Sequence, residues 1–175
     1  MHPAFSRALF VPTFVWNYGL ARVLHRRNWW DQVDPYVVLG ALPLRRDVKK
    51  LAELGVRGVI NMCREYPGPV AAYATYGIEQ LWLPTIDFNP PTLLDVERGV
   101  DFLERKTKQQ ETVYVHCKAG RARSATIVIC WLVKHRGMSP EQAQEHLLRC
   151  RPHVNPHLLE RQVVRQYLGI VERPS

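Results

Sequence analysis

The chain lacks the features that mark disulfide-stabilised, membrane-spanning and nucleic-acid-binding proteins. It has only four cysteines, with no CxxC and no paired spacing, as expected of free thiols in a reducing compartment. Its uncharged, aromatic stretch at residues 8–21 is shorter than the roughly 20 apolar residues of a membrane-spanning helix. Zinc-finger spacings and RNP-like aromatic strands are also absent, so nucleic acid ranks last among the possible partners.

Acidic residues are missing from the first 30 positions, although four arginines occur there and the whole chain carries a net charge of +8. Such a basic excess suits an anionic membrane surface or an anionic substrate. We therefore divide the chain into a basic, aromatic arm at residues 1–29 and one domain at residues 30–175. The arm is interpreted as a targeting peptide, as a membrane-surface segment that includes Trp29 and Trp30, or as an apolar arm packed on the domain.

Hydrophobic periodicity in the domain predicts an α/β fold, with a central, mostly parallel sheet flanked by helices. Short apolar runs predict the strands, and amphipathic stretches with capping residues predict the helices. We expect strands at residues 36–39, 57–62, 78–83 and 112–116, and helices at residues 46–54, 123–135 and 155–168, with further helices that start near residues 92 and 139. Thr92 and Ser139 are the expected N-caps of these last two helices.

The most informative stretch is VYVHCKAGRARS at residues 113–124, where a buried strand ends and a helix begins. Backbone N–H groups in such a turn form an anion-binding nest, and the helix N-terminus adds positive charge at the same point. Gly120 supplies a backbone conformation that most residues avoid. The loop is therefore predicted to bind a dianionic phosphate through the residues that follow the cysteine, which are Lys118, Ala119, Gly120, Arg121, Ala122 and Arg123.

Cys117 opens this loop, and a cysteine at a helix N-terminus beside a cation has a lowered pKa. We expect Cys117 to act as a thiolate nucleophile. The planar fork of Arg123 can hold two phosphate oxygens, and the Ser124 hydroxyl can bond the sulfur as it leaves. The spacing thus predicts a phosphatase in which Cys117, Arg123 and Ser124 carry the chemistry.

The HCxxGxxRS pattern resembles the protein tyrosine phosphatase superfamily, and its small dual-specificity branch in particular. The resemblance implies a cysteinyl-phosphate intermediate, no metal or other cofactor, and a general acid on an upstream loop. Asp87, which lies after a predicted strand and before Pro90-Pro91, is the expected acid. Asp95 and Asp101 are rivals, but Asp95 suits a helix cap and Asp101 lies inside the predicted helix.

A second resemblance, to the mitochondrial phosphatidylglycerophosphate phosphatases, extends over most of the domain. The segments that carry it are DPYVVLGALPL (34–44), RGVINM (57–62), REY (64–66), GIEQL (77–81), TID (85–87), YVHCKAGRARSA (114–125) and SPE (139–141). Glu65 and Tyr66 match part of that family's Glu-Glu-Tyr-Glu loop and are expected at the substrate pocket. Arg64 replaces an acid of that loop, a departure that leaves the exact headgroup preference open.

This resemblance implies removal of the terminal phosphate of phosphatidylglycerophosphate, which supplies phosphatidylglycerol for cardiolipin synthesis. The protein is then expected to work as a monomer at a peripheral anionic membrane surface. In a eukaryote that surface is the matrix side of the mitochondrial inner membrane, and otherwise it is the cytoplasmic face of the membrane. Lys118 and Arg121 support a substrate with several negative charges, although each of them can also be an ordinary basic surface residue.

Several alternatives remain at this point. The chain can be a protein phosphatase for phosphotyrosine or phosphoserine, or a phosphoinositide phosphatase. Two further alternatives are a non-catalytic phosphate-binding module, which the intact Cys117, Asp87 and Arg123 disfavour, and a rhodanese-type sulfurtransferase, whose active loop is shorter. Cys63 ends a predicted strand near the site, where it is either a packed thiol or a partner for Cys117 under oxidation, as in some lipid phosphatases of the superfamily.

Overall fold

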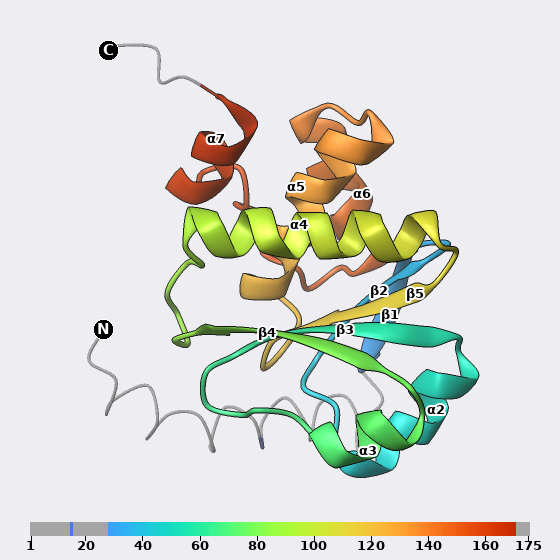
Figure 1. Cartoon of the computed structure of the whole chain (residues 1–175). Helices are drawn as coiled ribbons and strands as arrows, with labels where there is room; N and C mark the ends of the chain where they lie inside the picture. Colours follow the sequence, from blue (N-terminus) through green and yellow to red (C-terminus); the bar gives the residue numbers. More distant parts are fainter. Residues whose placement is uncertain (1–14, 16–27, 171–175) are drawn as a thin grey trace.

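A five-stranded sheet forms the centre of the computed structural model, which describes residue 15 and residues 28–170. The strand order is β1-β2-β5-β3-β4, and the pairing is parallel everywhere except between β1 and β2 (Figure 1). The strands are β1 (Trp30–Asp34), β2 (Val37–Gly40), β3 (Val56–Cys63), β4 (Glu79–Thr85) and β5 (Thr112–His116). The predicted α/β fold with a mostly parallel sheet is confirmed. Because β5 lies in the middle, the loop that follows it emerges beside the ends of β2 and β3.

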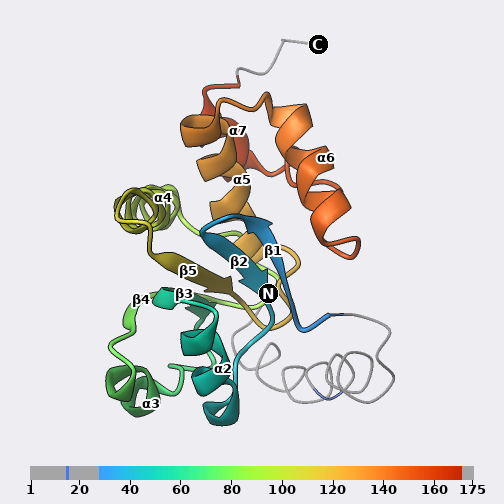
Figure 2. The same cartoon turned by 90° about the vertical axis from the view of Figure 1, so that its right-hand side faces the viewer.

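Helices cover both faces of this sheet (Figure 2). One face carries α4 (Leu93–Lys108), α5 (Arg123–Arg136), α6 (Pro140–Cys150) and α7 (Gln162–Leu168), and the other carries the 3-10 turn η2 (Arg45–Asp47), α2 (Val48–Glu53) and α3 (Val70–Thr75). Each face has its own apolar core, the larger under α4 and α5 and the smaller under α2 and α3. Helix α5 is the central element of the larger core, where Ile127 and Trp131 are fully buried. The helix that starts at the phosphate-binding loop is therefore held firmly in place.

The predicted capping residues act as expected. The Thr92 hydroxyl accepts the N–H of Asp95 at 3.1 Å at the start of α4. At the start of α6, Ser139 and Gln142 bond each other's backbone N–H groups, at 3.2 and 2.9 Å. Helix α5 ends at Gly137, whose φ of 67° suits a glycine C-cap.

The prediction of a helix over residues 155–168 is wrong in its first half, because α7 begins only at Gln162. The backbone N–H of Asn155 donates to the carbonyl of Arg121 at 2.8 Å. The Gln144 side chain, from α6, bonds the carbonyl of Asn155 at 3.2 Å and the N–H of Leu158 at 3.0 Å. The Asn155 carbonyl, which would accept the first N–H bond of the predicted helix, is bonded to the Gln144 side chain instead. Together these tertiary bonds attach the α6–α7 connection to the phosphate-binding loop.

Most of the arm at residues 1–29 lies outside the described residues, so its targeting or membrane role stays a prediction. Trp29, however, is buried and its indole N–H donates to the carbonyl of Leu42 at 3.1 Å. Trp30 belongs to β1 and contacts the Tyr114 ring edge-on at 6.0 Å between centroids. The two tryptophans therefore pack on the domain. Within the part of the chain described, no helix combines the length and apolarity needed to cross a membrane.

Candidate active site

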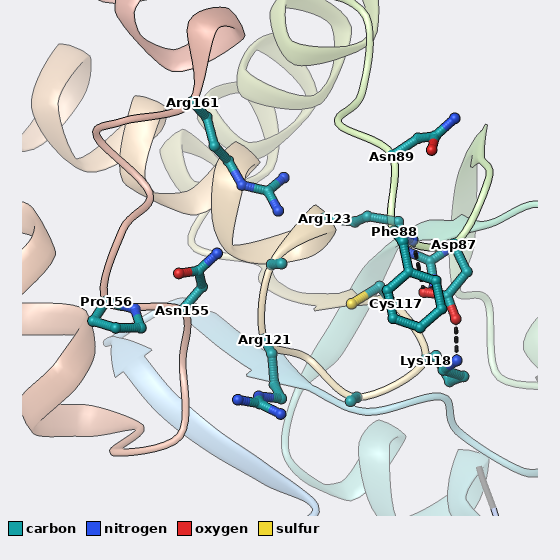
Figure 3. A pocket seen from close by; sticks show the side chains of 12 residues that line it. Asp87, Phe88, Asn89, Cys117, Lys118, Arg121, Arg123, Asn155, Pro156 and Arg161 are labelled. Atoms are coloured by element: carbon teal, nitrogen blue, oxygen red, sulfur yellow. Dashed lines mark hydrogen bonds and ion pairs between the residues drawn. The ribbon is translucent and has the colours of Figure 1, made fainter. Parts of the chain in front are cut away.

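A cavity of about 520 Å³ opens at the carboxyl ends of the parallel strands (Figure 3). Its floor is the Cys117–Arg123 loop between β5 and α5, one wall is the turn that follows β4, and the other wall is the α6–α7 connection. The cavity thus collects Cys117, Asp87 and Arg123, which are far apart in the sequence. Ligand sites in open α/β sheets lie at this edge.

The loop places its backbone N–H groups toward the cavity. Gly120 has a φ of 64°, and a Cβ at this position would collide with the carbonyl of Gly40. The carbonyls of Ala119 and Gly120 point away from the cavity and accept bonds from Arg151, at 3.0 and 2.9 Å. Since C=O and the following N–H are antiparallel in a trans peptide, the N–H groups of residues 120 and 121 face the opposite way, as an anion nest requires.

Arg151 is the buried support of this loop. Its side chain is 1% exposed, and besides the two loop carbonyls it binds the carboxylate of Asp31 on β1 at 2.5 Å. The guanidinium therefore fastens the loop to the edge of the sheet. Sequence reasoning missed Arg151, since nothing in the residue pattern separates one buried arginine from the many exposed ones.

Cys117 is 4% exposed and lies at the base of the cavity. Burial raises the pKa of its thiol, but the Arg123 charge, the Ser124 hydroxyl and the N–H groups of Ser124 and Arg121 outweigh burial and lower the pKa to about 7. The Ser124 hydroxyl donates to the sulfur at 3.3 Å. Burial lowers the pKa of the neighbouring His116 to about 3, so this ring stays neutral. A substantial thiolate fraction is thus available near neutral pH.

Arg123 is held by acceptors from two neighbouring segments, the loop after β3 and the end of β4 with the turn that follows it. One guanidinium nitrogen donates to the carbonyl of Thr85 at 2.7 Å and to the carboxylate of Glu65 at 3.3 Å. The other terminal nitrogen donates to the Asp87 carboxylate at 2.8 Å. The arginine that is predicted to hold the phosphoryl group is therefore preoriented, and it touches the predicted general acid directly.

Glu65 and Tyr66 differ from their predicted place, because neither lines the cavity. Glu65 lies behind it, where one carboxylate oxygen accepts the N–H of Asp87 at 2.9 Å and the other binds Arg123. The Tyr66 hydroxyl donates to the carbonyl of Pro43 at 3.1 Å. We infer that Glu65 positions the acid and the arginine, while Tyr66 holds the loop that carries Glu65.

Asp87 lies in the turn after β4, at the edge of the cavity. Besides Arg123 it contacts the Lys118 ammonium, so both carboxylate oxygens face cations. The next residue, Phe88, has a φ of 67° and a mostly exposed ring that lies 5.1 Å from the Lys118 nitrogen. The rival Asp95 is the capping partner at the start of α4, and Asp101 borders a separate groove between α4 and α7. Asp87 is therefore the only one of these three acids that lines the cavity.

The loop cations Lys118 and Arg121 are placed unequally. Lys118 is buried against Asp87, whereas Arg121 is exposed and its Nε donates to the carbonyl of His153 at 2.8 Å. A cation that sequence reasoning missed, Arg161, lies on the opposite wall together with Asn155. Arg161 precedes α7 directly, and the sequence pattern gives no sign that this position lies across the cavity from the loop.

The remaining predicted feature concerns Cys63, which ends β3 and is fully buried. Burial raises the pKa of its thiol well above the usual value, so it is protonated near neutral pH. The thiol is free, and an oxidative partnership with Cys117 stays a prediction. Among the described residues, no group of three or more His, Cys, Asp and Glu side chains is placed to hold a metal ion.

Comparison with known proteins gives consistent matches. The family described as dual specificity phosphatase, catalytic domain, matches residues 37–167. The phosphatidylglycerophosphate phosphatase PTPMT2 of Arabidopsis thaliana is 40% identical over 165 residues, which cover 93% of this chain and 72% of that protein. The phosphatidylglycerophosphatase and protein-tyrosine phosphatase 1 of Rattus norvegicus is 37% identical over 171 residues, covering 93% and 89%.

Solved structures show the same relationship. A crystal structure of PTPMT1 superposes with a TM-score of 0.72 at 38% identity, covering 81% of this chain and 94% of that one. A structure of PTPMT1 in complex with PI(5)P gives a TM-score of 0.73 at 36% identity, covering 81% and 96%. Each superposition thus covers most of this chain and nearly all of the solved chain.

Proposed function

The chain belongs to the dual-specificity phosphatase family, in the group of the phosphatidylglycerophosphate phosphatases, and we propose that it converts phosphatidylglycerophosphate to phosphatidylglycerol. One observation carries the chemistry: the Cys117 thiol, with its pKa lowered to about 7, lies at the base of a cavity beside Arg123. The substrate is proposed from the two relatives described above, both of which are named as phosphatases of phosphatidylglycerophosphate.

The first step follows from the geometry of the loop. The Cys117 thiolate attacks the phosphorus of the monoester, an S–P bond forms, and the P–O bond to the glycerol breaks with its electron pair going to the glycerol oxygen. The nest and Arg123 bind the equatorial oxygens, on which the transition-state charge is spread. In the second step water attacks the phosphorus, the S–P bond breaks, and the Ser124 hydroxyl stabilises the departing thiolate at its 3.3 Å distance.

Asp87 is the proposed proton donor to the glycerol oxygen in the first step, and the proton acceptor from water in the second. In the structure its carboxylate is ion-paired with Arg123 and Lys118. A bound phosphate competes with the Asp87 carboxylate for the Arg123 guanidinium. Phosphate binding therefore releases Asp87 from Arg123, on the side of the cavity where the leaving group lies.

We further propose that the enzyme works on an anionic membrane surface as part of cardiolipin synthesis. In a eukaryotic cell this surface is the matrix side of the mitochondrial inner membrane. The net charge of +8 supports the proposal, because each basic residue near an anionic bilayer contributes roughly 1 kcal/mol to binding.

The decisive test is phosphate release from phosphatidylglycerophosphate in anionic vesicles, measured beside a phosphoinositide and a phosphotyrosine peptide. We expect the largest kcat/KM for phosphatidylglycerophosphate and no turnover in the Cys117→Ser variant. Since one relative is also named a protein-tyrosine phosphatase, activity on peptides is the second candidate. A wild-type enzyme that prefers the peptide would replace our proposal with that alternative.

A further inference from the structure

The cavity is larger than one phosphate needs, and its second wall has its own polar groups. A volume of about 520 Å³ lies in the range of pockets for whole small ligands. Figure 3 shows the Arg161 guanidinium directed into the cavity from the side opposite Asp87 and Lys118, with the Cys117 sulfur between the two walls. A group attached to a phosphate on the loop would meet this wall.

Arg161 differs from the other cations of the cavity in its pairing. Lys118 and Arg123 are already paired with carboxylates, and Arg121 is exposed and turned toward the carbonyl of His153. Across residues 28–170, the contact found for the Arg161 guanidinium is a long one of 3.5 Å to the hydroxyl of Thr126, and no carboxylate lies within ion-pair distance. Burial lowers the pKa of Arg161, while the nearby charges act in opposite directions: Cys117 raises the pKa and Arg123 lowers it. A partly buried cation without a carboxylate partner gains most from an anion that enters the cavity.

The position of Arg161 is fixed by its backbone. Its N–H donates to the carbonyl of Leu158 at 3.2 Å, and its carbonyl accepts the N–H groups of Val164 and Arg165 at 3.0 and 3.1 Å as α7 begins. The same connection is attached to the catalytic loop by the bond of 2.8 Å from the Asn155 N–H to the Arg121 carbonyl. The second wall is therefore held at a constant distance from the nest.

Asn155 adds an oriented donor to this wall. Its side-chain oxygen accepts the N–H of His157 at 2.9 Å, which fixes the orientation of the amide. The amide nitrogen is then the end that faces the cavity, on the same side as Arg161 (Figure 3). A guanidinium and an amide N–H₂ form a set of donors without an acceptor, as suits a second anion.

We propose that Arg161 and Asn155 form a second anion subsite, which binds the phosphodiester of the substrate while the Cys117–Arg123 loop holds the terminal monoester. The subsite rests on the proposed function, since phosphatidylglycerophosphate has a monoester and a diester phosphate on one glycerol. Arg161 is then a specificity-determining residue that selects substrates with a second negative charge at this spacing. It takes the role that sequence reasoning gave to Lys118 and Arg121.

Two soluble phosphates test the subsite apart from the membrane. Deacylated phosphatidylglycerophosphate has both anions, whereas glycerol 3-phosphate has the same kind of alkyl leaving group and the monoester alone. In Arg161→Gln we expect KM for the first compound to rise about ten- to a hundredfold, the usual loss for a charge-assisted hydrogen bond. The kcat for that compound, and kcat/KM for glycerol 3-phosphate, should stay within about twofold.

Two further variants control this comparison. Arg161→Lys keeps the charge but not the fork, so it should recover part of the lost affinity. Arg149→Gln removes one exposed charge outside the cavity and should leave kcat and KM for both compounds unchanged. Equal losses on both compounds in Arg161→Gln, or no loss on either, would overturn the subsite. Failure of the proposed function gives a different result. The wild-type enzyme would then have a higher kcat/KM for the phosphotyrosine peptide than for the lipid, whatever its relative kcat/KM for the two soluble phosphates.

Discussion

The support that Arg151 gives to the catalytic loop can be separated into a contribution to stability and a contribution to catalysis. In Arg151→Met the Asp31 carboxylate, whose side chain is only 11% exposed, loses the guanidinium at 2.5 Å. Breaking a buried ion pair by removing one partner costs about 3–5 kcal/mol. For a domain of this size, this corresponds to a fall in melting temperature of roughly 6–20 °C. The carbonyls of Ala119 and Gly120 also lose their donors, so the loop is free to turn its N–H groups away from the phosphate.

Two milder variants separate these effects. Arg151→Lys keeps a charge beside Asp31, but one ammonium cannot reproduce the fork that reaches both loop carbonyls. Asp31→Asn leaves the Arg151 guanidinium bonded to the loop carbonyls and removes the negative charge with which it is paired. We therefore expect Arg151→Lys to lower kcat about 10²-fold or more, the usual loss for a misplaced oxyanion donor, at a modest loss of stability. For Asp31→Asn we expect the reverse, with stability lowered and kcat within about threefold.

The assay combines urea denaturation, followed by circular dichroism, with kcat for p-nitrophenyl phosphate at a temperature where every variant is folded. Full activity in Arg151→Lys would refute the reasoning, because the backbone of the loop would then need no external support. A parallel loss of kcat and stability in all three variants would also contradict it, since the variants would then act only through folding.

Three further predictions concern the chemical step. The kcat/KM for p-nitrophenyl phosphate should rise with pH through about 7, because Cys117 is protonated below its pKa and a thiolate above it; Ser124→Ala should move this rise to higher pH, and an unchanged profile would contradict the role of the hydroxyl. Asp87→Asn should lower kcat for an alkyl phosphate by about 10²- to 10⁴-fold and should lower kcat for an aryl phosphate less. Equal losses for the two substrates would reject Asp87 as the acid. The control Asp95→Asn should lower only the free energy of unfolding, by about 1 kcal/mol. Cys117→Ser should bind phosphate in calorimetry without turnover, and residual turnover within tenfold of wild type would exclude Cys117 as the nucleophile.

The parts of the molecule that were predictable from the sequence are those fixed by short-range chemistry. The strand, the turn and the helix around Cys117 lie within one stretch of the chain, so their residue types reveal the nest directly. The caps at Thr92 and Ser139 depend on residues three positions apart, and both were correct. The missed strand β1 has a polar, alternating sequence on the edge of the sheet, and the missed helix α3 has no capping bond and buries only Tyr73.

Contacts between distant segments were not predictable in this way. Arg151 reaches Asp31 across 120 positions, and the segment that was predicted to begin a helix at Asn155 binds a loop 34 positions away. Neither partner can be chosen from residue type, because many arginines and carbonyls are equally suitable. Glu65 shows the same limit: it was placed at the right loop by resemblance, yet the structure places it behind Asp87 and Arg123 and not in the cavity.

The distribution of charge in the cavity changes how substrate preference has to be tested. From the sequence, Lys118 and Arg121 were expected to add their charges to that of Arg123 on the substrate. In the structure Lys118 contacts Asp87, so replacing it disturbs the acid as well as the electrostatic field. A double replacement of Lys118 and Arg121 would therefore lower turnover of every alkyl phosphate, and this loss would reveal little about selection between substrates. Arg161 is free of this difficulty, since it contacts neither Cys117 nor Asp87 by any hydrogen bond or ion pair found in the described structure. The selectivity of the enzyme for a second phosphate is therefore best tested at Arg161.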